Sequence, residues 1–145
     1  MTSKSELESL HRLFFKVAKG LLQKDGYLSP LVVVGAGTKA FVYSLPQDKE
    51  TWFIFVMTLL RTHGAGSYFI VGEAWAVAME RLIESLPPSE NPARTEILFV
   101  YGCSRYGSKI ARYQQFVRDP DGIRYVGPVD VCSNWEFRRM MPENW

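Results

Sequence analysis

Cysteine and histidine are scarce in this sequence, and their scarcity restricts the chemistry open to it. Among 145 residues there are two cysteines, Cys103 and Cys132, and two histidines, His11 and His63. Two thiols outside a Cys-x-x-Cys pair cannot by themselves make a structural zinc site, and the sequence has no His-Glu-x-x-His motif. We therefore expect free thiols in a reducing compartment, and neither a metal nor a cofactor.

Long apolar runs and a strong net charge are also absent. The longest apolar run, residues 52–57, is far shorter than the ~20 residues that span a bilayer, and residues 1–6 lead into an amphipathic pattern rather than a signal peptide. A formal net charge of +2 is too near balance to indicate a nucleic-acid or membrane partner. We expect a soluble, cytoplasmic protein with no membrane partner.

The apolar content is sufficient for a substantial core. Hydrophobic residues make up 47% of the chain and aromatic residues 14%. At this length, that composition predicts a single globular domain over residues 1–145. The tail, residues 134–145, is rich in tryptophan, arginine and methionine, which are typical of interface cores. It is expected to dock on the domain or to lie at an interface.

Hydrophobic periodicity predicts a helix and a hairpin in the first part of the chain. Apolar residues recur at helical spacing over residues 7–21, and Gly26 provides a stop. Residues 31–34 and 40–43 follow as two strands. The glycine-bearing segment 35–39 superficially resembles a phosphate loop, but a strand pattern rather than a helix follows it. We therefore expect a hairpin turn.

The rest of the chain predicts one buried helix and a series of strands. The helix begins after Asp48 and ends before Gly64, and it is apolar nearly all round. A strand is expected at 68–75 and a short helix at 79–86. Further strands are expected at 96–103, 109–117 and 123–126.

This order of elements, α-β-β-α-β-(α)-β-β-β, predicts an α+β fold. We expect a mixed, mostly antiparallel sheet with the two main helices packed on one of its faces.

Two glutamates on neighbouring strands are the first candidates for chemistry. Glu73 follows an apolar strand run and Glu96 opens the next strand, so pairing of the strands could bring the carboxylates together. Close carboxylates can bind a divalent cation or transfer protons. A strand-carboxylate nuclease would usually have a lysine two residues after the second acid, where Leu98 stands. The structural alternative is an ion pair between Glu73 and Arg94.

The proline-rich loop between these strands is a candidate binding platform. Prolines lower the entropy of the unfolded loop, so residues 87–94 can be ordered without having a function. Rigid loops are equally suitable for presenting a binding site. The candidate binding residues are Glu73, Trp75, Ser89, Glu90, Arg94 and Glu96.

Basic and aromatic residues are interleaved in the C-terminal strands. Lys109, Arg112 and Arg118 lie among tyrosines and phenylalanines, a combination that can hold single-stranded nucleic acid. Strand alternation divides such residues between two faces, and nearby aspartates dilute the positive charge.

The central segment resembles a family of small uncharacterised proteins from bacteria and their phages. In that family, a Glu-Ala-Trp or Glu-Ser-Trp strand end precedes a Pro-Ser-Glu-His-Pro-x-Arg-x-Glu loop. Here residues 72–75 are Gly-Glu-Ala-Trp and residues 88–96 are Pro-Ser-Glu-Asn-Pro-Ala-Arg-Thr-Glu, with Asn91 in place of the histidine. The resemblance covers about the middle half of the chain. It implies a bacterial or phage cytosolic origin and a common fold, without an assigned activity.

The sequence thus leaves the function unknown and three hypotheses open. The first is a non-enzymatic protein that acts through protein–protein interaction, with another protein or with itself as a homodimer. The second is a metal-dependent hydrolase or nuclease that uses Glu73 and Glu96. The third is a nucleic-acid-binding protein that uses Lys109, Arg112 and Arg118.

Overall fold

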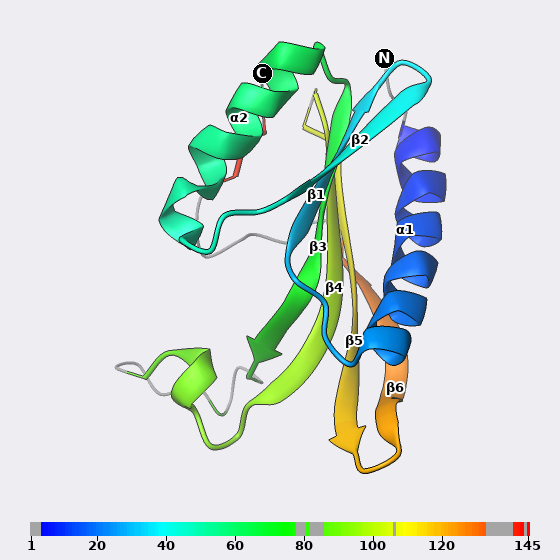
Figure 1. Ribbon diagram of the computed structural model, residues 1–145. Coiled ribbons are helices and arrows are strands. Elements are labelled where there is room, and N and C mark those ends of the chain that lie inside the picture. The colour runs from blue at the N-terminus through cyan, green and yellow to red at the C-terminus, as the bar shows by residue number, and fades with distance from the viewer. Residues whose placement is uncertain (1–3, 78–80, 82–85, 106, 133–140, 144) are drawn as a thin grey trace.

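The chain folds into one antiparallel sheet with a long helix on each side (Figure 1). The computed structural model describes residues 4–77, 81, 86–105, 107–132, 141–143 and 145. In chain order the elements are α1 (Lys4–Asp25), β1 (Leu31–Ala36), β2 (Lys39–Ser44), η1 (Lys49–Thr51), α2 (Trp52–His63), β3 (Ser67–Ala76), η3 (Pro88–Glu90), β4 (Thr95–Ser104), β5 (Lys109–Asp119) and β6 (Gly122–Cys132).

The six strands form a single sheet in the order β2-β1-β3-β4-β5-β6. All five neighbouring pairs run antiparallel, so the predicted α+β class is confirmed and no parallel pair occurs among the described strands. Because β1 lies between β2 and β3, these two strands run in the same direction. The helix α2 connects them across one face of the sheet.

The two long helices lie on opposite faces of the sheet, so the prediction that both pack on one face is wrong (Figure 1). Trp52, Val56 and Leu60 of α2 are buried on one face, and α1 is buried on the other. The physical reason lies in the central strands, which are apolar without alternation. Val32, Val33 and Val34 are all buried, as are residues 68–71 and 97–101. Strands of this kind need cover on both faces.

Local signals in the sequence agree with the ends of these elements. The Asp48 carboxylate accepts a hydrogen bond from the Glu50 amide at 3.0 Å, at the turn of η1 that leads into α2. Gly64 ends α2 with a φ of 60°, a left-handed conformation that glycine adopts without strain. Residues 37–38 connect the paired strands β1 and β2, with Gly37 at a φ of 64°. The glycine-bearing segment is therefore a hairpin turn.

The described residues of the C-terminal tail lie on the face that α2 covers. Met141 and Pro142 are buried there, and Tyr68 donates a hydrogen bond to the Pro142 carbonyl. The indole of Trp145 donates to the Ala65 carbonyl at 2.6 Å. Residues 133–140 and most of the short helix expected at 79–86 lie outside the described residues. In the part of the chain that the structure describes, neither α1 nor α2 is both long enough and apolar enough to cross a membrane.

Candidate functional site

Two of the predicted carboxylates, Glu73 and Glu96, meet on one guanidinium. Arg118 donates to Glu73 through Nη2, and its Nε lies 3.2 and 3.1 Å from the two carboxylate oxygens of Glu96. The Arg118 Nη1 atom donates to the main-chain carbonyl of Gly26. The second oxygen of Glu73 accepts the Leu28 amide at 2.9 Å. We call Glu73, Glu96 and Arg118 the Arg118 cluster.

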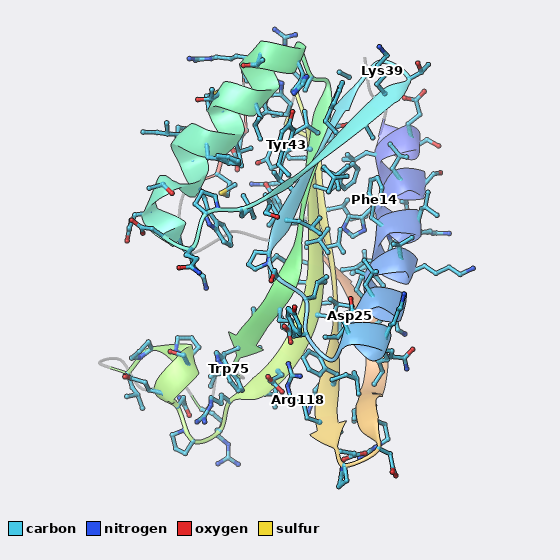
Figure 2. All side chains as sticks on the ribbon, viewed as in Figure 1. Phe14, Asp25, Lys39, Tyr43, Trp75 and Arg118 are labelled. Atoms are coloured by element: carbon cyan, nitrogen blue, oxygen red, sulfur yellow. The ribbon has the colours of Figure 1, made fainter. Side chains whose placement is uncertain are left out.

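Strand register explains why these three side chains converge. Glu73 pairs with Leu98, and Glu96 pairs with Phe116, two residues before Arg118. Leu98 and Phe116 are buried in the core beneath α1, and side chains two apart on a strand share a face. The cluster therefore lies on the α1 face, just past the C-terminal end of that helix. Figure 2 shows Arg118 below Asp25, the last residue of α1.

Glu73 does not pair with Arg94, the partner predicted from the sequence. Its ion pair is with Arg118, whereas the guanidinium of Arg94 lies 4.8 Å from the ring centroid of Trp75. Arg94 also donates to the Asn91 carbonyl at 3.1 Å. Trp75 lies directly opposite Glu96 in the β3–β4 register and is 42% exposed. Arg94 therefore extends the edge of the cluster without joining its ion pairs.

The proline-rich loop folds around Asn91. The side chain of Asn91 is buried, donates to the Arg81 carbonyl at 3.0 Å and accepts the Ala93 amide at 2.8 Å. Ser89 and Glu90 lie exposed in η3. No contact among the described residues joins these two side chains to the Arg118 cluster.

The three basic residues considered for nucleic-acid binding do not form one surface. Lys109 pairs with Glu143 at 2.7 Å. In register it lies opposite Cys103, which is buried on the α2 face. Arg112 is buried on the α1 face, and Arg118 belongs to the cluster. Each side chain is thus held by an internal partner, at a different place on the sheet.

The Arg118 cluster joins separate parts of the chain rather than presenting an open set of ligands. Its contacts link the α1–β1 connection, through Gly26 and Leu28, to β3, β4 and β5. The Arg118 guanidinium already neutralises the two carboxylates, and the Leu28 amide bonds the other oxygen of Glu73. Among the residues that the structure describes, no group of three or more histidine, cysteine, aspartate or glutamate side chains could hold a metal ion.

Sequence reasoning missed a second polar cluster, which is buried under α1. His11 is fully buried, its Nε2 lies 2.5 Å from the Val100 carbonyl, and its Nδ1 lies 2.7 Å from Nη1 of Arg112. Since arginine only donates, His11 accepts at Nδ1 and donates at Nε2 as a neutral ring. Burial is the main cause that lowers the pKa of His11 to about 4, with a further contribution from the charge of Arg112. Glu8 lies 4.0 Å from Arg112.

A sequence signal for this cluster did exist. His11 continues the helical spacing of the buried residues Leu7, Phe15, Ala18 and Leu22. A polar side chain on the core stripe of a helix needs hydrogen-bond partners from whatever packs on it.

Removing the Arg118 guanidinium should destabilise the fold. We expect Arg118→Ala to lower the free energy of unfolding by about 2 kcal/mol, because it leaves two partly buried carboxylates facing each other. The matched control is Arg124→Ala, on the neighbouring strand, whose pair with Asp119 is more exposed and should contribute less than about 0.5 kcal/mol. Urea denaturation measures both, and equal losses would contradict the role assigned to the cluster.

Comparison with known proteins places this chain in a family. A family model described as bacteriophage lambda protein ea47 matches residues 1–140. No curated protein and no solved structure matches the chain. The match takes in both helices, all six strands and every residue of the two polar clusters, so it extends well beyond the central segment. This chain therefore belongs to the family of bacteriophage lambda protein ea47.

Proposed function

We propose that this protein acts by associating with other protein chains, and that α1 supplies the contact surface. The observation that carries the proposal is a row of exposed apolar side chains along this helix. Their exposed fractions run from 37% to 53%, well above what a core residue shows. The row, which we call the α1 stripe, consists of Leu10, Leu13, Val17 and Leu21.

The α1 stripe is additional to the face that α1 buries in its own domain. The buried face is formed by Leu7, His11, Phe15, Ala18 and Leu22, which already cover the sheet. At 3.6 residues per turn, the stripe follows the flank beside this face. An apolar flank that the domain itself does not bury is typical of a helix with a second partner.

Contacts on the other flank show which way the α1 stripe points. The Lys19 ammonium lies 4.4 Å from the Tyr125 ring of β6, and Glu8 lies 4.0 Å from Arg112 of β5. The α1 stripe therefore points toward the β1–β2 side of the sheet. There the register places Val42, which is 63% exposed, on the same face as the buried Val33. Val42 lies on β2, the edge strand of the sheet, and is not part of the α1 stripe.

The two alternative functions have less support from the geometry. A hydrolase or nuclease that uses Glu73 and Glu96 would need Arg118 to give up both carboxylates. A nucleic-acid interface would need Lys109 and Arg112 to leave internal partners that lie on opposite faces. The α1 stripe needs no rearrangement to be covered by a partner.

A capture experiment tests the proposal. The full chain, in wild-type form or with Leu13→Glu, is expressed in a bacterial host and cross-linked, and the attached chains, copies of itself included, are identified by mass spectrometry. We expect Leu13→Glu to reduce capture at least about tenfold, because a charge cannot be buried at an apolar contact. The matched control is Ile54→Glu on α2, where an isoleucine is 71% exposed on the other face. Equal capture by all three forms, or capture by none, would overturn the proposal.

A further inference from the structure

We infer that the chain covering the α1 stripe is a second copy of this protein, packed so that the two α1 helices run antiparallel about a two-fold axis. This inference rests on the proposed function and names its partner. It follows from the spacing of the stripe, from the charges at its two ends and from the requirement that a two-fold contact be self-complementary.

The spacing of the α1 stripe fits a helix–helix contact. Its residues are separated by three, four and four positions, the intervals that keep side chains on one seam between two helices. The stripe is also nearly symmetric about the middle of α1. When a second α1 runs in the opposite direction, Leu13 lies opposite Val17 of the other copy, and Leu10 lies opposite Leu21.

Charges at the two ends of the stripe favour this direction. Glu6, in the first turn of α1, and Lys24, in the last turn, continue the same seam, and both are exposed. In an antiparallel pair each Glu6 lies opposite Lys24 of the other copy. A parallel pair would instead place like charges together at both ends. The helix dipoles also favour opposite directions.

The same charges explain why a second copy fits better than an unrelated helix. One surface carries both members of each complementary pair, so two copies satisfy both ends at once. Lys16 lies at the outer margin of the seam, near the axis. Its long side chain can extend into water on the side away from the sheet, which limits repulsion between the two copies.

Sedimentation velocity over a wide concentration series tests the inference on the full chain. We expect the wild type to show a monomer–dimer equilibrium, and Leu13→Glu and Val17→Glu each to weaken it about 100-fold. Two controls should leave the equilibrium unchanged. Ile54→Glu alters the exposed side of α2, and Val42→Lys alters β2, the sheet edge that offers the other route to self-association. The substituted side chains are at least half exposed, so folding should survive, and circular dichroism confirms it.

Charge exchange tests the direction of the helices. Glu6→Lys alone places two lysines at each end of the pair, and Lys24→Glu alone places two glutamates there. Each variant should therefore self-associate about tenfold more weakly than the wild type. An equal mixture of the two variants forms heterodimers in which both ends are complementary, so association should recover. A parallel pair already places like charges together in the wild type, so each single variant would associate about as strongly as the wild type and the mixture would associate more tightly than it. A contact elsewhere would respond to neither change.

The results separate this inference from the proposed function. Any one of four results would overturn the second-copy arrangement. These are a wild type that stays monomeric, a dimer that Leu13→Glu leaves intact, a dimer that Val42→Lys abolishes, and a mixture without recovery. If one of these occurs while capture of other proteins still depends on Leu13, a different chain covers the α1 stripe and the proposed function stands. If self-association and capture are both absent, both proposals fail.

Discussion

Gly102→Ala should lower the free energy of unfolding by about 3 kcal/mol, one of the two largest effects that we expect. Gly102 is buried on β4, on the face that α1 covers. A Cβ atom there would lie 2.7 and 2.8 Å from two ring carbons of Phe69 and 3.2 Å from Cδ2 of His11. Phe69 cannot retreat easily, because it is 1% exposed and Phe14 of α1 packs edge-on against it at 4.8 Å. The new methyl group would therefore lift α1 from the sheet.

Gly72 provides the matched control for this substitution. It is also a buried strand glycine, but a Cβ there would meet Phe99 at 3.5 and 3.6 Å and Pro30 at 3.6 Å, which are ordinary contact distances. We expect Gly72→Ala to change stability by less than about 1 kcal/mol. Adding Phe69→Leu to Gly102→Ala should recover part of the loss. If chemical denaturation shows an equal loss of stability in the two alanine variants, the close approach of α1 to β4 is not what requires glycine at position 102.

Acidification from neutral pH to about pH 4 should destabilise the fold through His11 by about 3 kcal/mol. The pKa of His11 is lowered to about 4 in the folded protein, against about 6.5 in an unfolded chain. Between these two values the unfolded state binds more protons than the folded state. Stability therefore falls as the pH drops below about 6.5, and the loss is complete near pH 4. A protonated ring would place a second cation against Arg112 in the core.

The contribution of His11 is isolated by comparing how much stability the wild type and a His11 variant lose between pH 7 and pH 4. Carboxylates also titrate in this range, so the measured quantity is the free energy of unfolding at pH 7 minus that at pH 4, in the wild type and in His11→Gln. We expect the difference to be smaller in the variant by about 3 kcal/mol. His63→Gln is the control, since His63 is partly exposed and bonds Tyr43 at 2.7 Å on the other side of the sheet. A His11 imidazole that titrates near pH 6.5 by NMR would contradict this account.

Elements with a clear hydrophobic period were predictable from the sequence. The face of the sheet that each helix covers was not. Helical spacing before Gly26 gave α1, and two glycine-centred turns gave the β1–β2 hairpin and the end of α2. The prediction that both helices pack on one face is wrong because the central strands carry apolar side chains on both faces. The three consecutive buried valines of β1 show that the sheet is covered on both faces.

The polar clusters depend on register, which sequence spacing does not reveal. Glu73 and Arg118 are 45 positions apart and meet only because β4 sets β3 and β5 in register on either side of it. Arg94 lies close in sequence to Glu96, yet it turns toward Trp75. His11 lies at helical spacing with the residues that α1 buries, but its partners lie 89 and 101 positions away. Local sequence patterns therefore do not identify the partners of these polar groups.

The distance along the chain between α1 and its partners affects how the protein is made. The ribosome completes His11 before Val100 exists, and 89 positions separate them. At about 5–20 residues per second, that interval lasts roughly 5 to 20 s. During this time the core face of α1 lacks β4 and β5 to pack on, so the emerging chain exposes that face in addition to the α1 stripe. The nascent chain is therefore most prone to wrong association, and most in need of a chaperone, before β4 and β5 have been synthesised.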